Sequence, residues 1–148
     1  MQNLIIKTFS ELTTSELYQI LRLRSEVFVV EQDCVYQDVD DKDQQAIHLF
    51  ITTKNKIVAY TRLFAPGLYF DTASIGRVVV SLEYRKDGLG HQVMDASIKA
   101  VQQKFNTSKI SISAQTYLKK FYESHGFIQK GNKYLEDGIP HIKMVYNK

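Results

Sequence analysis

A valine-rich segment, a double-glycine turn and a long amphipathic segment follow one another in the middle of the chain. Residues 75–80 end in three consecutive valines, as is typical of a strand covered on both faces. Residues 85–90 then read Arg-Lys-Asp-Gly-Leu-Gly, and in residues 89–105 the apolar side chains recur at helical spacing. A turn that joins a strand to a helix in this way places backbone N–H groups at the positive end of a helix dipole. The segment therefore predicts an α/β fold with a turn suited to bind phosphate.

The turn differs from two well-known nucleotide-binding loops. From Gly88 the chain reads Gly-Leu-Gly-His-Gln-Val, so Val93 stands where a Rossmann fingerprint has its third glycine. The Gly-Lys-Ser/Thr of a P-loop is absent from the sequence. Gly88 and Gly90 would allow positive φ angles and close approach of a ligand, and Arg85 and Lys86 would add positive charge. An ordinary turn and a diphosphate-binding loop both fit this segment.

The rest of the chain reads as further strands and helices, without a repeat or linker that would divide it. Expected strands are residues 3–8, a hairpin of 46–53 and 57–64, and then 75–80, 109–114 and 139–146. Expected helices begin at Thr13 or Thr14, at Leu89 and at Tyr117, the last of them ending before Gly126. A chain of 148 residues has the size of one ordinary domain, so residues 1–148 are expected to form a single domain.

The first helix is expected to bury an apolar face together with the aliphatic stem of an arginine, and this face comprises Leu17, Ile20, Leu21, Arg24, Val27 and Phe28. The mostly polar residues 30–45 are expected to be irregular. Cys34, the lone cysteine, fits a reducing compartment and reads as a small, semi-buried residue.

Composition and charge exclude several classes of protein. The net charge of +3 comes from 19 basic and 16 acidic residues, which is too even for an electrostatic nucleic-acid binder. No apolar run approaches the ~20 residues that span a membrane. The N-terminal apolar stretch is too short for a signal peptide. We therefore expect a cytoplasmic protein that binds neither nucleic acid nor membrane.

Three sets of residues resemble a known family. The Arg-x-x-Gly-x-Gly of residues 85–90 resembles the acyl-CoA pyrophosphate loop of the GNAT superfamily of N-acetyltransferases. The Phe-Tyr-Glu-x-x-Gly-Phe of residues 121–127, which follows a predicted strand, resembles the second hallmark of that superfamily. Residues 23–32, 36–40, 77–80 and 136–142 together resemble the ElaA-like bacterial branch, and this resemblance covers essentially the whole chain.

The resemblance implies a fold, a reaction and a set of binding residues. The fold would be a mixed central sheet flanked by helices, with splayed central strands, and acetyl-CoA would be the co-substrate. Tyr122 would donate a proton to the CoA thiolate, a role suited to a phenol with a pKa of about 10. The backbone of one strand would hold the pantetheine arm and the thioester carbonyl, and the loop would hold the diphosphate. These cofactor-binding residues would be Val78, Val79, Val80, Arg85, Lys86, Asp87, Gly88, Leu89, Gly90 and His91.

Several side chains could accept the proton of an ammonium acceptor. Glu31 ranks first, because it follows the first helix at the place where GNAT acceptor sites are usually walled. His141 ranks next, from the Gly-Ile-Pro-His entry of the last strand, and Glu26 and His48 are further candidates. Each of these residues also has an ordinary structural reading, as a solvated carboxylate or a hydrogen-bonded histidine.

Neither the acidic residues between positions 38 and 43 nor the histidines have the spacing of a known metal-binding motif. Asp38, Asp40, Asp41 and Asp43 lack the order of an EF-hand loop and are expected to be solvated, or to attract a cationic amine to a pocket mouth. The four histidines are scattered and no His-Glu-x-x-His is present. The sequence thus predicts an acetyl-CoA-dependent N-acetyltransferase in which a primary amine attacks directly, acting as a monomer or homodimer. The alternative is a non-catalytic acyl-CoA-binding or regulatory module.

Overall fold

The computed structural model describes residues 2–147, which form an eight-stranded mixed sheet between helices. The strand order is β1-β2-β3-β4-β5-β8-β6, and β7 pairs with the other end of β8. Within residues 2–147 the strand pairs are antiparallel except for β4 and β5, which are parallel. The strands are β1 (Gln2–Thr8), β2 (Ile47–Thr53), β3 (Lys56–Phe64), β4 (Ala73–Val80), β5 (Lys109–Gln115), β6 (Ile128–Gln129), β7 (Tyr134–Glu136) and β8 (Ile139–Asn147).

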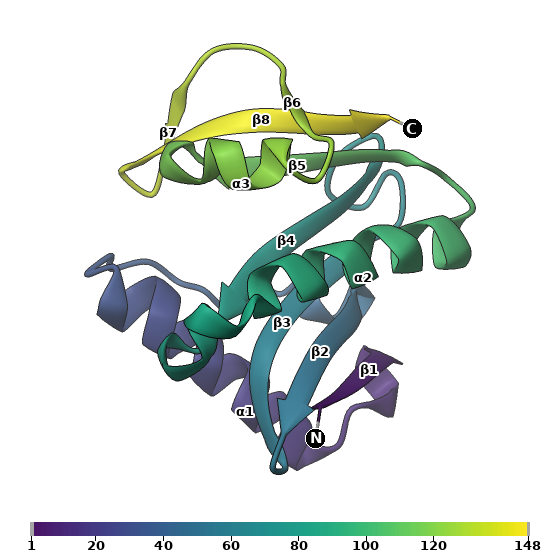
Figure 1. Cartoon of the computed structure of the whole chain (residues 1–148), viewed down its shortest axis with the longest axis vertical. Helices are drawn as coiled ribbons and strands as arrows, with labels where there is room; N and C mark the ends of the chain where they lie inside the picture. The colour runs from purple at the N-terminus through teal and green to yellow at the C-terminus, as the bar shows by residue number, and fades with distance from the viewer. Residues whose placement is uncertain (1, 148) are drawn as a thin grey trace.

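Helices cover both faces of the sheet. In Figure 1, α2 crosses in front of β2, β3 and β4, while α1 lies behind them and α3 packs near β5 and β8. The α-helices are α1 (Thr14–Arg24), α2 (Leu89–Phe105) and α3 (Lys119–Glu123). The other helical segments are η1 (Phe9–Glu11), η2 (Ser25–Glu31), η3 (Asp43–Gln45), η4 (Leu82–Asp87) and η5 (Thr116–Leu118).

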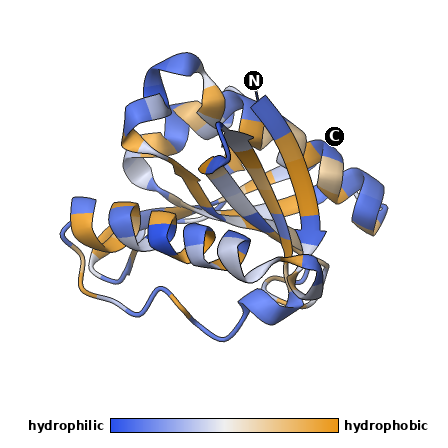
Figure 2. Cartoon of the chain, turned by 90° about the horizontal axis from the view of Figure 1, so that it is seen from below, coloured by the Kyte–Doolittle hydropathy of each residue, from blue (hydrophilic) through white to orange (hydrophobic). Residues whose placement is uncertain are grey.

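Alternation along β2 divides the core into two layers. Leu49 and Ile51 face the layer that includes α2, whereas Phe50 faces the layer that includes α1. In Figure 2 the central strands are largely orange, and the helices alternate between orange and blue along their length, as amphipathic helices do. Each large apolar side chain buried in these layers contributes ~1.5–3 kcal/mol to stability, which holds both helices on the sheet.

The strands β4 and β5 separate soon after they meet. They pair only at Ala73 with Ile110 and at Ser74 with Ser111, although β4 continues to Val80 and β5 to Gln115. Figure 1 shows the two strands diverging, with β1–β4 on one side of the opening and β5–β8 on the other. The expected splaying of the central strands is therefore present, and residues of both strands line a cavity where they separate.

The first helix begins as predicted and runs further than predicted. Thr13 caps it by accepting a hydrogen bond from the backbone N–H of Glu16, whose carboxylate in turn accepts from the backbone N–H of Thr13. After Arg24 it continues as the π-helical η2, where Gln32 N donates to Val27 O at 3.1 Å. The prediction that residues 30–45 are irregular is therefore wrong at its start, because bonds to the fifth preceding residue extend the helix through Glu31.

The remaining differences from the sequence prediction are small. β4 begins at Ala73, two residues earlier than predicted, and the helix predicted from Tyr117 begins as a 3-10 turn before α3. Gly126, with φ 98°, follows the end of α3, as expected for a glycine after a helix. β6 and β7 were not predicted, because two or three residues are too few for an alternating pattern.

Candidate active site

A cavity of about 490 Å³ lies where β4 and β5 separate. One wall comes from η2 and the loop that follows it, and a second from β4 and the turn before α2. The opposite walls come from β5, the η5–α3 segment, β7 and the start of β8. The cavity is therefore assembled from segments that are far apart in the sequence.

The turn before α2 presents backbone N–H groups at one end of the cavity. Gly88 has φ 74°, a left-handed conformation that favours glycine, and it forms the N-cap of α2. The backbone bond from Gln92 N to Gly88 O begins the helical ladder, so the N–H groups of Leu89, Gly90 and His91 precede it. Such N–H groups at a helix N-terminus are suited to bind anionic oxygens.

The side chains of the predicted loop residues point in different directions. Arg85 and Gly90 line the cavity, whereas Lys86 and Asp87 are exposed and do not line it. Leu89 is fully buried in the core, so only its backbone could serve a ligand. The ring of His91 also lies off the cavity wall, with Nδ1 at 2.8 Å from Nε2 of His125.

Arg85 is bound by one of the predicted catalytic residues. Its Nη1 and Nη2 donate to Oε2 and Oε1 of Glu31 at 2.7 and 2.8 Å, and its Nε donates to the carbonyl of Val80 at 3.2 Å. The hydrogen bonds and charge of Arg85 lower the pKa of Glu31 below its usual range. A carboxylate with a lowered pKa is a weaker base, so Glu31 is less suited to proton abstraction than its position in the sequence suggested.

The predicted pantetheine strand forms the side of the cavity. Val78, Val79 and Val80 all line it, beyond the last residue of β4 that pairs with β5. The side chain of Val79 packs in the α1 layer, while Val78 and Val80 pack against the α2 layer. The valine side chains thus belong to the core, and the edge of β4 that faces β5 is open to the cavity.

Tyr122 of α3 lines the cavity, although the whole residue is only 5% exposed. Its ring meets Phe121 edge-on, with centroids 5.1 Å apart and planes at 79°. Burial raises the pKa of Tyr122 well above its usual value. Its hydroxyl therefore stays protonated and can only be a proton or hydrogen-bond donor to a developing anion.

His141, at the start of β8, has one nitrogen bound and the other available. Its Nδ1 lies 2.7 Å from the carbonyl oxygen of Ile139. Because a carbonyl can only accept, Nδ1 carries the hydrogen of the neutral ring and Nε2 carries the lone pair. Nε2 lies 3.6 Å from Oε2 of Glu136, and the residue lines the cavity. This arrangement suits a base, because Glu136 would stabilise the imidazolium that forms.

Glu136 is itself held in place by a hydrogen bond from β5. The hydroxyl of Ser113 on β5 donates to Oε1 of Glu136 at 3.0 Å and is also bonded to the hydroxyl of Tyr134. The Tyr134 ring stacks on the His141 ring, with centroids 6.1 Å apart and planes at 23°. Neighbouring segments thus orient the Glu136 and His141 pair on one wall of the cavity.

The other two base candidates do not reach the cavity. His48 is fully buried between the hydroxyl of Tyr60, at 2.7 Å, and the carbonyl of Asp43, at 2.9 Å. Burial lowers the pKa of His48, so it is a neutral part of the core. Glu26 is exposed and does not line the cavity.

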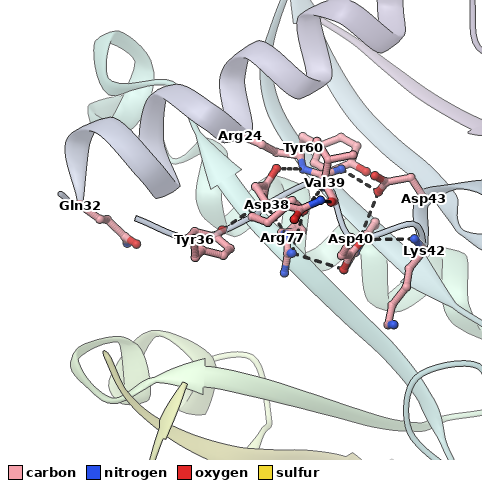
Figure 3. Close-up of polar contacts among 12 residues, drawn as sticks. Arg24, Gln32, Tyr36, Asp38, Val39, Asp40, Lys42, Asp43, Tyr60 and Arg77 are labelled. Carbon is pink, nitrogen blue, oxygen red and sulfur yellow. Dashed lines mark hydrogen bonds and ion pairs between the residues drawn. The ribbon is translucent and has the colours of Figure 1, made fainter. Parts of the chain in front are cut away.

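The acidic run is part of a closed ring of ion pairs, so the prediction of a solvated loop is wrong. The N–O distances between neighbours in the ring are 2.6–3.4 Å, and each acid bridges two arginines. Figure 3 shows the acids of the loop meeting arginines from α1 and β4. Asp41 alone of the four predicted acids stays outside the ring. The members alternate in the order Arg24, Asp38, Arg77, Asp40, Arg62 and Asp43.

The ring also corrects the prediction for Arg24. Its whole side chain is 0% exposed, so its guanidinium is buried as well as its stem. Burial alone would lower the pKa of Arg24, but the bond to Asp43 and the charges around it raise the value. Since the acids are neutralised by arginines, the ring offers no surplus negative charge to attract a cationic amine.

Several cavity residues were missed because their signal was weak. Arg77 and Glu136 entered the sequence analysis only as members of the family-like segments 77–80 and 136–142. An arginine inside an otherwise apolar strand is a usable signal, because it needs buried partners. Cys34, expected to be semi-buried, is buried beside the cavity with Sγ at 3.4 Å from the carbonyl oxygen of Asp137.

Residues 2–147 hold neither a cluster of metal-ligand side chains nor a helix that could span a membrane. Three or more His, Cys, Asp and Glu side chains nowhere come together in an arrangement that could hold a metal ion. None of the helices in this part of the chain combines the length and apolar character needed to cross a membrane.

The chain is similar to known proteins over almost its whole length. The acetyltransferase (GNAT) domain model matches residues 10–148. A UPF0039 protein of Schizosaccharomyces pombe is 43% identical over 142 residues, which cover 95% of this chain and 93% of that protein. Protein ElaA of Escherichia coli is 39% identical over 138 residues, which cover 92% of this chain and 90% of that protein.

Solved structures agree with the sequence relatives. The crystal structure of an acyl-CoA N-acyltransferase from Pseudomonas aeruginosa has a TM-score of 0.93 and 40% identity, and the match covers 99% of both chains. The crystal structure of Escherichia coli ElaA has a TM-score of 0.92 and 36% identity, and the match covers 99% of this chain and 100% of that chain. The chain therefore belongs to the GNAT acetyltransferase family, as an ElaA-like member.

Proposed function

We propose that the protein transfers an acetyl group from acetyl-CoA to a primary amine by direct attack of the amine. The observation that carries this proposal is the open edge of β4, which lies in one cavity with Gly90 at the N-terminus of α2 and with the side chains of Tyr122 and His141. The diphosphate of CoA would bind the N–H groups of Leu89, Gly90 and His91, with Arg85 beside them. The pantetheine arm would then run along Val78–Val80 as an added strand.

The reaction needs a neutral amine, stabilisation of the oxyanion that forms, and protonation of the CoA thiolate as it leaves. In the proposal, Nε2 of His141 takes a proton from the acceptor ammonium, and Glu136 stabilises the resulting imidazolium. The amine nitrogen then bonds to the thioester carbon, and a backbone N–H of β4 donates to the carbonyl oxygen as it becomes anionic. The C–S bond breaks, and Tyr122 gives its proton to the sulfur. The nitrogen, which carries an extra proton after the attack, releases it to solvent as the amide forms, and the Tyr122 oxygen regains a proton from solvent.

Glu31 keeps a place in the proposal, with a changed role. Its carboxylate is bound to Arg85, so we assign proton abstraction to His141 and leave Glu31 as the ion-pair partner of Arg85. The alternative of a non-catalytic acyl-CoA-binding module predicts the same loop contacts but no use for the His141 and Glu136 pair.

The test is a transfer assay with labelled donor. The protein would be incubated with deuterated acetyl-CoA and a panel of amines, and both thiol release and label in the amide product would be measured. Transfer with matching thiol and product yields supports the proposal. A protein that binds acetyl-CoA in calorimetry but forms no labelled amide with any amine would instead be a binding module.

The assignment of the base has its own test. His141→Gln should lower the turnover number ~10²–10⁴-fold with little change in acetyl-CoA affinity, because general-base catalysis contributes that range. His125→Gln is the matched control, since His125 does not line the cavity. An equal effect of both variants would remove His141 from the proton path.

A further inference from the structure

Arg77 is the member of the ion-pair ring that lines the cavity, and its backbone is strained. Its φ is 49°, in the left-handed region, where a residue other than glycine costs roughly 1–2 kcal/mol. It follows Gly76 at an irregularity of β4, where the pairing with β3 shifts register between Tyr60 and Arg62. Strain of this kind persists where the surroundings enforce it, and it often marks a functional position.

The Arg77 guanidinium is fixed on two sides by the ring. Nε donates to Oδ1 of Asp38 at 2.7 Å, and Nη2 donates to the carbonyl oxygen of Asp38 at 3.0 Å and to Oδ2 of Asp40 at 3.4 Å. Its Cζ also lies 5.8 Å from the centroid of the Tyr36 ring, whose hydroxyl is bonded to Asp38. An arginine held in this way loses little further side-chain freedom when it binds a ligand.

One nitrogen of Arg77 remains for a ligand. Nη1 makes no hydrogen bond to any residue between 2 and 147, and the side chain is 17% exposed. Figure 3 shows one terminal nitrogen of Arg77 directed away from the carboxylates of the loop. Because Arg77 lines the cavity, the two N–H groups of Nη1 are available to a ligand bound there.

Among the described side chains that line the cavity, Arg77 is the cationic one with a free hydrogen-bond donor. The other arginine on the wall, Arg85, is occupied by Glu31. The ring as a whole is neutral, with three arginines and three aspartates, and Asp38 and Asp40 do not line the cavity. The ring thus presents a donor to the cavity and keeps its acids behind that donor.

We propose that Arg77 binds a carboxylate of the acceptor, so that the acceptor is an amine that also carries a carboxylate. The proposal rests on the acyl transfer proposed above. The amine would lie toward His141 and Glu136 on the β8 side, and the carboxylate toward Nη1 on β4. A carboxylate is the preferred partner of a fixed guanidinium, because a charge-assisted hydrogen bond is stronger than a neutral one.

The test compares acceptors that carry a carboxylate with their amides and with the amines that lack it. The first trio is leucine, leucinamide and isoamylamine, and the second is β-alanine, its amide and ethylamine, which changes the spacing between the amine and the carboxylate. For at least one trio, we expect kcat/KM for the acid to exceed that for the amide ~10–100-fold, the range of one hydrogen bond to a charged group. Equal values for acid and amide in every trio would overturn the proposal.

Two variants of Arg77 and one control connect this preference to the side chain. Arg77→Gln should reduce the preference for the acid to within ~3-fold of the amide, mainly by raising KM for the acid, and Arg77→Lys should retain part of it. Arg22→Gln removes an exposed arginine that does not line the cavity and should leave the preference unchanged. An unchanged preference in Arg77→Gln overturns the assignment, and a general loss of folding would be recognised by its equal effect on all acceptors.

Calorimetry separates a failure of this proposal from a failure of acyl transfer. The CoA-bound protein would be titrated with the acids and amides of both trios, which needs no turnover. If no amine is acetylated but acids still bind better than amides, acyl transfer fails and the Arg77 site stands. If amines are acetylated but acids and amides bind equally or not at all, the Arg77 site fails and acyl transfer stands.

Discussion

Glu31 and Arg85 form a bidentate ion pair that joins the end of the π-helical η2 to the turn before α2. The two N–O distances are 2.7 and 2.8 Å, and the two side chains are 37% and 36% exposed. Both residues line the cavity, so the pair lies where the proposed diphosphate would bind. The carboxylate of Glu31 would compete with that diphosphate for the Arg85 guanidinium.

This competition predicts the effect of Glu31→Gln on cofactor binding. The variant should bind acetyl-CoA up to ~5-fold more tightly, because a half-exposed ion pair contributes roughly 0–1 kcal/mol and would no longer have to be broken. Titration calorimetry at low salt measures the change, and Glu26→Gln on the exposed side of η2 is the control. Weaker binding by Glu31→Gln would mean that Glu31 holds Arg85 in its binding position.

The Gly88 turn predicts a separable effect on binding. Gly88→Ala forces alanine into a left-handed conformation with φ 74°, at a cost of roughly 1–2 kcal/mol. Relaxation of that strain would displace the N–H groups beside it, so acetyl-CoA affinity should fall ~10-fold or more. Gly131→Ala is a matched control, because Gly131 has φ 94°, is exposed and lies off the cavity.

The two glycine variants are distinguished by comparing stability with affinity. Urea unfolding should show a similar loss of stability in both, since neither added Cβ would meet an atom within 4 Å. Only Gly88→Ala should lose acetyl-CoA affinity in calorimetry. Parental affinity in a folded Gly88→Ala protein would argue that diphosphate does not bind at this turn.

The main elements of the fold could be predicted from the sequence because their signals are local. The helical spacing of Met94, Ile98 and Val101 and the valines of β4 each depend on a few neighbouring residues. The glycine turn between them is equally local, and the Phe-Tyr-Glu segment is similar to one in a known family. These features assigned Tyr122 and Val78–Val80 to one binding site, and in the structure all four residues line the same cavity.

The ion-pair ring and the pairing of Glu136 with His141 could not be predicted, because they depend on contacts that the linear sequence does not show. Asp38 meets Arg24 and Arg77, which are 14 and 39 residues away, only after α1 and β4 have packed together. Sequence spacing gives no information on such partners, so the acids resembled a solvated run. The pairing of Gln115 with His141 similarly brings β5 beside the Glu136 and His141 pair.

The ring predicts how stability depends on pH. Burial opposes ionisation of Asp40 and Asp43, but the bonds from Arg62 and Arg24 hold the pKa of each carboxyl below its usual value. The unfolded chain binds protons at these carboxyls near pH ~4, while the folded ring does not. The contribution of Asp40 and Asp43 to stability is therefore complete above the unfolded pKa and is lost as pH falls toward the folded pKa.

Asp40→Asn should reduce the slope of that pH dependence. Asp40 and Asp43 each add up to about 1 kcal/mol per pH unit between pH ~5 and ~3, and Asp40→Asn removes the first of these contributions. Urea unfolding at a series of pH values measures the slope. Asp41→Asn is the control, because Asp41 is exposed, outside the ring and in a left-handed conformation that asparagine tolerates. Equal slopes in the parent and Asp40→Asn would contradict the ring's role.

Tyr122 provides the sharpest test of the chemistry. Its burial raises its pKa, so it remains a donor at every pH where the protein would act. A hydroxyl that only protonates the departing thiolate stabilises the transition state more than the bound substrate. Tyr122→Phe should therefore lower the turnover number on the order of 10²-fold, the low end for a general acid, because a thiolate is already a competent leaving group.

Two controls show whether a loss of turnover in Tyr122→Phe comes from the missing proton donor. They are the acetyl-CoA affinity of that variant and the turnover of Tyr117→Phe. Calorimetry should give nearly parental acetyl-CoA affinity, since only one oxygen is removed. Tyr117→Phe is the control, because Tyr117 lines the same cavity but is 71% exposed and free to be solvated by water. We expect it to retain at least a third of parental turnover, a change of under ~1 kcal/mol. Parental turnover in Tyr122→Phe, measured where chemistry limits the rate, would leave Tyr122 as a packing residue and require another proton donor for the thiolate.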